Sequence, residues 1–226
     1  MIVSMNFLLV YAHNEPKSFT ASLHNAAQSI LTQQGHQVVT SDLFGVGFHP
    51  VAERYDFTTL SGEHYNYMNE QEVAAKHDLA YSPDIIEEIQ KVKTADVVLF
   101  FFPLWWNAPP AMLKGWFDRV LTKGTAWDGN HLFSTGLLRG KAAGVVVSVG
   151  DPENFYRPDG LHKATVQQML YPLLHGTLAF CGFNVLEPFV AYGLTAANDF
   201  GIQEQLRDCS VRLSNIESNP RFIYKF

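Results

Sequence analysis

The amino-acid sequence predicts a single α/β domain over residues 1–226, with a doubly wound parallel sheet in the strand order 2-1-3-4-5. Short apolar runs alternate with stretches in which apolar residues recur at helical spacing, which is typical of a parallel sheet covered by helices. The run at residues 97–102 is apolar throughout and predicts a central strand buried on both faces. Right-handed crossovers make 2-1-3-4-5 the simplest order.

The composition limits the classes of function. With 47% hydrophobic and 17% charged residues, the chain can bury a large core, and its net charge of -6 argues against nucleic acid as a partner. Two cysteines, Cys181 and Cys209, provide neither a disulfide framework nor a metal site. The apolar N-terminus lacks a signal-peptide pattern and no run is long enough for a transmembrane helix, so we expect a cytoplasmic protein without stable membrane insertion.

The first strand and helix are predicted at residues 7–12 and between Ser18 and Gly35. Ser18 is a good N-cap, and Gly35 ends the helical spacing. The hydroxyls of Ser18, Thr20 and Ser22 and the free N–H groups of this helix start form a natural anion site. The alternative is an ordinary capped helix.

A second strand is predicted at residues 37–41, and residues 57–81 form an insertion without a clear period. The insertion is expected to contain some helix and to cover a site or meet another subunit. Ser82, Pro83 and Asp84 then cap a helix that leads into the central strand.

Two tryptophans, Trp105 and Trp106, directly follow the central strand. Ligands of open α/β sheets bind outside the carboxyl ends of strands, so these rings are placed to contact a flat aromatic ligand. The alternative is that they only pack the loop. Pro109 and Pro110 then begin a helix with one apolar face.

The last third of the chain predicts a buried strand at residues 142–149, a helix at 167–180, a strand at 184–190 and a helix at 200–216. After the first of these strands, Tyr156 and His162 bracket a turn. A phenol and an imidazole so placed can share a proton-transfer task. The alternative is a hydrogen-bonded loop pair without a chemical role.

The chain resembles the NAD(P)H:quinone oxidoreductases of the DT-diaphorase type in four ordered blocks, which are YAHNEPKSFTASL, SDLFGVGFHP, FFPLWWNAPPAMLKGWFDRV and FCGFNVLEP. The resemblance runs from about residue 7 to residue 213. It implies a flavodoxin-like fold, bound FAD and a homodimer with its active sites at the interface. It also implies two-electron transfer from NAD(P)H through the flavin to a quinone, with both substrates using one pocket in turn.

The resemblance places cofactor contacts in three segments of the chain and at Asp118. Thr20 stands where an asparagine is usual, and Asp151 stands at the second glycine of a TTGG sequence. The implied cofactor-binding residues are His13, Ser18, Phe19, Thr20, Ser22, Pro103, Leu104, Trp105, Trp106, Asn107, Asp118, Ser148, Val149, Gly150, Asp151 and Tyr156.

The resemblance also implies catalytic and substrate-binding residues. Tyr156 and His162 match the tyrosine and histidine that handle charge on the flavin, and His162 favours the NAD(P)H-using branch. Trp127, Gly129 and Phe180 match pocket walls contributed by the partner subunit. The implied substrate-binding residues are Trp106, Asn107, Trp127, Gly129, Phe155, His162 and Phe180.

Several expectations remain open at this point. His175 matches one ligand of a metal site, but Ala179 replaces the second, so we expect no metal. An arginine expected near Gly201 is absent, which leaves FMN as the alternative to FAD. Azo or nitro compounds are alternative acceptors, and a flavin-binding ancillary subunit of a potassium efflux system is the alternative function. Trp116, Phe117 and the helix ending at Phe180 are expected to supply an apolar dimer interface.

Overall fold

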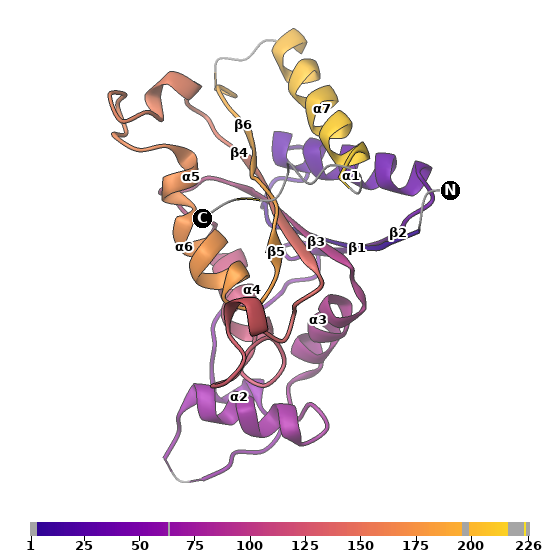
Figure 1. The fold of residues 1–226 in the computed structure, drawn as a ribbon, viewed down its shortest axis with the longest axis vertical. Coiled ribbons are helices and arrows are strands. Elements are labelled where there is room, and N and C mark those ends of the chain that lie inside the picture. The colour runs from indigo at the N-terminus through magenta and orange to yellow at the C-terminus, as the bar shows by residue number, and fades with distance from the viewer. Residues whose placement is uncertain (1–3, 63, 196–198, 217–223, 225–226) are drawn as a thin grey trace.

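A computed structural model of the chain describes residues 4–62, 64–195, 199–216 and 224. These residues form a six-stranded parallel sheet in the order β2-β1-β3-β4-β5, with β6 also paired to β4 (Figure 1). The predicted order and the single α/β domain are therefore confirmed. The strands are β1 (Asn6–Tyr11), β2 (Gln37–Asp42), β3 (Val97–Pro103), β4 (Ala142–Ser148), β5 (Asn184–Val185) and β6 (Phe189–Ala191).

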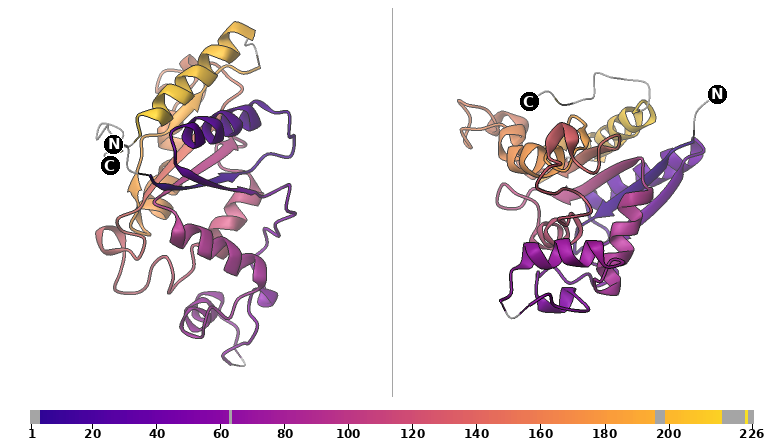
Figure 2. Two further views of the ribbon diagram at one scale, coloured as in Figure 1. Left: turned by 90° about the vertical axis from the view of Figure 1, so that its right-hand side faces the viewer. Right: turned by 60° about the horizontal axis from the view of Figure 1, so that its bottom comes forward.

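The central strand β3 is buried along its whole length, as predicted. Alternate side chains enter two cores, with Val98, Phe100 and Phe102 on one face and Val97, Leu99 and Phe101 on the other. The first face is covered by α3 (Pro83–Thr94) and α4 (Ala111–Val120), and the second by α1 (Phe19–Gln33) and α7 (Asp199–Ser214) (Figures 1 and 2). The doubly wound architecture follows from this two-sided burial.

The predicted helix starts are correct in position. Ser18 is the N-cap of α1, and its Oγ accepts a hydrogen bond from the Ala21 N–H (3.1 Å). Gly35 follows the helix at a φ of +87°, which a residue with a side chain rarely adopts. Ser82 occupies the N-cap of α3, but its hydroxyl donates to Asp84 Oδ1 (2.5 Å) and does not cap a backbone N–H.

Two predicted elements are interrupted by prolines. The strand expected at residues 184–190 is divided into β5 and β6, because Pro188 has no N–H to donate to a neighbouring strand. The helix expected at 167–180 is divided at Pro172, which cannot donate to the carbonyl four residues earlier. Its pieces are α5 (Val166–Met169), α6 (Tyr171–Leu173) and a π-helical turn, η4 (Leu174–Ala179).

Trp116 and Phe117 lie inside the chain, and the prediction that they supply a dimer interface is wrong. Trp116 is 0% exposed and Phe117 is buried, both packing edge-on against Phe100. The Trp116 Nε1–H donates to Glu88 Oε2 (2.7 Å), so its one polar group is also satisfied within the chain. The predicted apolar face of α4 is present, but it packs against the sheet.

A buried arginine joins the segment after β2 to the body of the domain. The segment contains a short helix, η1 (Arg54–Asp56), and α2 (Tyr67–Lys76), and Phe57 pairs with Tyr81 across the base of the expected insertion. Arg119 of α4 donates to Asp56 Oδ1 (Nη2, 2.9 Å) and to Asp84 Oδ2 (Nη1, 2.7 Å). Arg119 and Asp56 are both buried.

We expect Arg119→Ala to lower the free energy of unfolding by about 3–5 kcal/mol, because it leaves the Asp56 carboxylate buried without its cation. Urea denaturation measures this change. Lys114→Ala is the matched control on the same helix, because Lys114 and Asp118 form an exposed pair, whose loss costs about 1 kcal/mol or less. Equal effects of the two substitutions would contradict the structural role of Arg119.

Candidate active site

The carboxyl ends of β1, β3 and β4 lie side by side at one edge of the sheet. The Ala12 N–H donates to the Phe101 carbonyl (2.9 Å), and the Leu104 N–H donates to the Ser148 carbonyl (2.9 Å). Pro103, the last residue of β3, is in register with Ser148. The structure therefore brings together the three segments predicted to bind the cofactor, at the place where open α/β sheets bind ligands.

The loop between β1 and α1 is held by its own hydrogen bonds. The Glu15 N–H donates to His13 Nδ1 (2.9 Å), and the Lys17 N–H donates to Glu15 Oε1 (2.7 Å). Burial lowers the pKa of His13, which favours the neutral imidazole that accepts this bond. The loop delivers Phe19 and the rest of the first turn of α1 to the edge, where free N–H groups attract an anionic group such as a phosphate.

Trp106 projects from a tight turn directly after β3. Trp105 and Ala108 exchange two backbone hydrogen bonds of 3.1 Å, and Trp106 and Asn107 between them have φ angles of +51° and +59°. Such angles cost about 1–2 kcal/mol for a residue with a side chain. Trp106 is 99% exposed, so it does not pack the loop, whereas Trp105 lies edge-on to His13 at 5.6 Å. A strained turn that presents a bare indole indicates a binding surface.

Thr20 and Ser148 connect the first turn of α1 to the end of β4. Their hydroxyl oxygens are 2.6 Å apart, and both residues are buried. One hydroxyl donates to the other, so at least one of the two hydroxyl hydrogens is used within the chain. The Ser22 hydroxyl is likewise used within the helix, where it donates to the Ser18 carbonyl (3.3 Å).

The backbone after β4 presents unused donors. The Val149 N–H donates to the Ala191 carbonyl (2.8 Å). In the described part of the chain, the N–H groups of Gly150 and Asp151 have no acceptor. Two adjacent free donors at the edge suit a ligand carbonyl or a developing negative charge.

Tyr156 and His162 form a stacked pair beyond this edge. Their ring centroids are 4.3 Å apart and the rings are nearly parallel, at 14°. The His162 N–H donates to the Phe155 carbonyl (2.9 Å), and Gly160 permits this tight loop because a Cβ there would lie 2.5 Å from the same oxygen. Burial and the charge of Asp151 raise the pKa of the Tyr156 phenol, so it keeps its proton at neutral pH.

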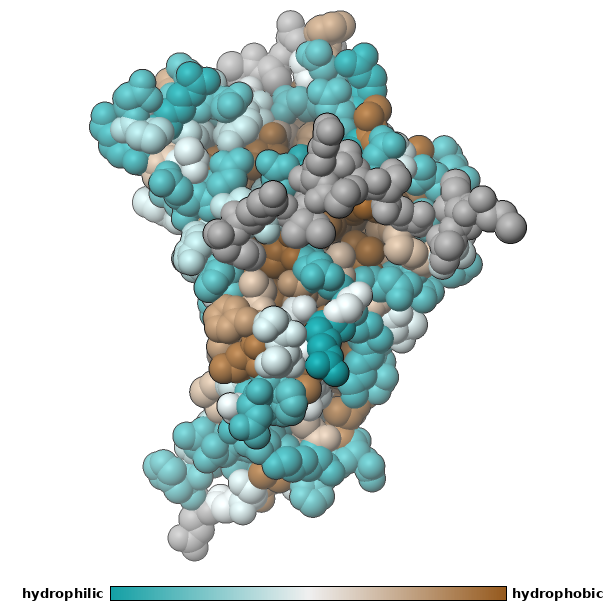
Figure 3. Space-filling view, in the orientation of Figure 1, coloured by the Kyte–Doolittle hydropathy of each residue, from teal (hydrophilic) through white to brown (hydrophobic). Residues whose placement is uncertain are grey.

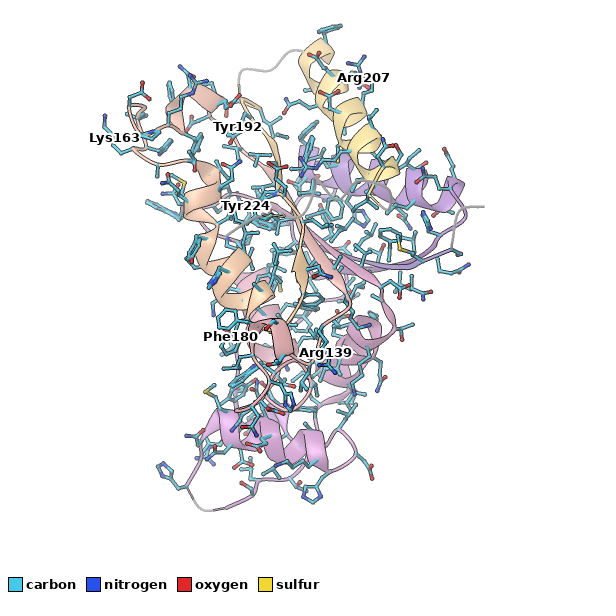
Figure 4. All side chains as sticks on the ribbon, viewed as in Figure 1. Arg139, Lys163, Phe180, Tyr192, Arg207 and Tyr224 are labelled. Atoms are coloured by element: carbon cyan, nitrogen blue, oxygen red, sulfur yellow. The ribbon has the colours of Figure 1, made fainter. Side chains whose placement is uncertain are left out.

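The aromatic wall predicted at Trp127 and Phe180 lies elsewhere in the chain. The two rings meet edge-on at 5.3 Å, and Phe133 joins them at 5.4 Å from Phe180. Figure 4 places Phe180 at the opposite end of the α5–α6–η4 segment from Lys163, the neighbour of His162 in sequence. Apolar residues gather on the surface over the end of η4 in Figure 3. Within one chain, this aromatic cluster therefore lies away from the Tyr156–His162 pair.

Other predicted residues are less closely tied to the edge. Asp118 lies on the exposed side of α4, where its carboxylate pairs with Lys114 (2.6 Å). A Cβ at Gly129 would meet open space. Tyr192, which the sequence reading did not single out, packs against Tyr156 at 5.8 Å, and burial raises its pKa to about 12. Its position directly after β6 was the signal that could have identified it.

The described residues contain neither a metal-binding cluster nor a membrane-spanning helix. No group of three His, Cys, Asp or Glu side chains there is arranged to hold a metal ion. The helices of this same part of the chain are all too short or too polar to cross a membrane. His175, expected from the resemblance to match one metal ligand, stacks on Tyr171 at 5.0 Å.

Known proteins match the chain over most of its length. The model of a family with the flavodoxin-like fold matches residues 5–213. The chain is 42% identical to the ribosyldihydronicotinamide dehydrogenase [quinone] of Homo sapiens (92% of this chain, 90% of that protein). It is 37% identical to NAD(P)H dehydrogenase [quinone] 1 of Cavia porcellus (92% and 76%).

A solved structure agrees with these relatives. The crystal structure of a protein described as a quinone reductase from Klebsiella pneumoniae superposes with a TM-score of 0.91 at 33% identity, covering 96% of this chain and 86% of that one. The sheet order and the position of the site at its carboxyl edge are those of this fold. The chain therefore belongs to the NAD(P)H:quinone oxidoreductase family with the flavodoxin-like fold.

Proposed function

We propose that this quinone oxidoreductase uses a bound flavin, FAD, and passes two electrons from NAD(P)H to a quinone or related aromatic acceptor in a ping-pong reaction. The observation that carries the proposal is the stacked Tyr156–His162 pair, held next to unused backbone donors at the carboxyl edge of the sheet. A proton donor and a proton acceptor in contact suit a redox site that must balance charge. The flavin supplies the two-electron chemistry.

The residues at the edge fit a flavin. The exposed indole of Trp106 offers a flat apolar face to a planar ring system, and Trp105 with Leu104 lines the same turn. The N–H groups of Gly150 and Asp151 are placed to donate to ring oxygens or nitrogens. The start of α1, with Ser18 and Phe19, suits the phosphates. Chromatography of the released cofactor distinguishes FAD from FMN.

Tyr156 and His162 are the proposed catalytic residues. The Tyr156 hydroxyl keeps its proton at neutral pH and can donate it in a hydrogen bond. The two ring nitrogens of an imidazole can donate or accept a proton, so His162 is the group suited to take up and return one. NAD(P)H as the donor is supported by His162, since the resemblance implies a different residue in the branch that uses dihydronicotinamide riboside. A cytoplasmic location accords with this donor and with two unpaired, buried cysteines.

The site is proposed to be completed by a second copy of the chain. Phe180, which contacts Trp127, lies far from Lys163, the sequence neighbour of His162, in Figure 4. A two-fold partner must therefore supply Phe180 and Trp127 if they form the opposite wall of the pocket. Because Trp116 and Phe117 are buried, the apolar contact area has to come from exposed residues such as Phe133 and Tyr171.

We expect Trp106→Ala to raise the Kd for flavin about 10-fold or more, because stacking and burial of an indole contribute about 1–3 kcal/mol. Fluorescence titration of the flavin-free protein measures it. Thermal stability should not change, because the side chain is 99% exposed and buries almost no surface in the free chain. Tyr55→Ala, a change at another exposed aromatic residue, is the control. An unchanged Kd would remove Trp106 from the cofactor site.

We expect His162→Gln to slow the bleaching of bound flavin by NAD(P)H about 100-fold or more, while the flavin content stays the same. The amide cannot exchange a proton as the imidazole does. Stopped-flow absorbance measures the rate. His77→Gln, at an exposed histidine remote from the edge, is the control. If both variants are bleached at the wild-type rate, His162 has no catalytic role.

Mixing two impaired variants tests the composite site. Trp127→Ala and His162→Gln, each inactive or nearly so alone, should recover activity after subunit exchange, because one of the two sites in a heterodimer then has both residues intact. Trp127→Ala mixed with Phe180→Ala is the control, since both sites of that heterodimer are damaged. Absence of recovery in the first mixture, with exchange proven by mass spectrometry, would place Trp127 and His162 in one chain's site.

A further inference from the structure

A carboxylate lies against the imidazole of the proposed catalytic pair. Asp151 Oδ2 is 3.3 Å from His162 Nε2, which lies on the edge of the imidazole ring. The ring of Tyr156 covers one face of the same imidazole. Asp151 stands where the family resemblance places a glycine, which has no side chain to make this contact. The contact is therefore a feature of this chain's own sequence.

Both partners in this contact are held in place. The Asp151 carbonyl accepts the Gly193 N–H (2.8 Å), which ties its backbone to the segment after β6. The His162 backbone is bonded to Phe155, and its ring is stacked on Tyr156. Three contacts thus hold His162: the backbone bond to Phe155, the stacking on Tyr156 and the contact with Asp151. Packing of a loop side chain alone does not need all three.

The chemistry of a carboxylate determines which ring nitrogen carries hydrogen. An ionised carboxylate only accepts hydrogen bonds, so Nε2 must be the donor in the bond to Asp151. In the neutral ring, the other nitrogen then has no hydrogen, because the partner of one nitrogen sets the state of the other. Nδ1 is the atom left to take up and return a proton.

We propose that Asp151 is a positioning residue that fixes the Nε2–H tautomer and the orientation of His162, so that Nδ1 exchanges the proton. This inference rests on the catalytic role proposed for His162. Among the charged groups nearby, Glu153 lies toward Tyr192, and Arg157, Asp159 and Lys163 are on the same loop. In the described part of the chain, Asp151 is the carboxylate that contacts the ring.

The first test observes the tautomer directly. Long-range ¹H–¹⁵N spectra of the flavin-loaded protein, assigned with His162→Gln, should show Nε2–H in the wild type. Asp151→Asn should shift the ring toward Nδ1–H, because an amide can donate to Nε2, and Asp151→Gly should give a mixture. Glu153→Gln is the matched control that removes a neighbouring carboxylate from the same loop. Unchanged tautomers in both Asp151 variants would overturn the proposal.

The second test measures the consequence for the reaction. Asp151→Asn should slow flavin bleaching by about 10- to 100-fold, the effect seen when the partner that orients a metal-binding histidine is removed. Asp151→Glu should keep part of the wild-type rate. Circular dichroism and flavin content show that the variants are folded and loaded. If His162→Gln is slow but the Asp151 variants are not, this inference fails alone. If His162→Gln is as fast as the wild type, the proposed catalytic role fails first.

Discussion

The complete burial of β3 is the constraint on which the rest of the structure depends. Its side chains fill two cores, so helices must cover both faces of the sheet around β3. The end of β3 is then more accessible to a ligand than its faces. At the carboxyl end the chain leaves β3 through the turn at Trp106 and Asn107, which carries an exposed ring outward. The packing of the core therefore also determines where the candidate site lies.

Polar groups in the core connect the covering helices to each other, to β2 and to the long segment after it. Glu88 of α3 receives the Trp116 Nε1–H and the Ser41 hydroxyl, and Arg119 of α4 binds Asp56 and Asp84. Burying a polar or charged group without a partner costs free energy, and a hydrogen-bonded partner offsets part of that cost. The bond between Arg119 and Asp56 holds the segment against α4, where Gly115 already allows the Pro50 backbone to come so close that no Cβ would fit.

The sequence was informative where local pattern decides the structure. The apolar run at β3, the Ser18 cap and the alternation of strands with helices predicted the sheet and its order, because each depends on neighbouring residues. Pairings between distant residues left no such signal: Asp56 and Arg119, or Thr20 and Ser148, meet only after folding. The sequence does not show that Trp116 is buried within its own chain, because an apolar face indicates that a helix is covered but not which element covers it. Tyr156 and His162 were found as neighbours in a turn, whereas the contact with Asp151 depends on side-chain direction.

The tasks proposed for the residues of the site differ in how much precision they need. Stacking on a planar ring depends on apolar area and tolerates small shifts, and the proposed stacking residue Trp106 is 99% exposed. Proton exchange needs a defined atom at a defined place. His162 accordingly has a backbone bond, a stacked neighbour and a charged partner, although it lies on a loop. A loop can thus give the precision of a helix or strand when several independent contacts converge on one side chain.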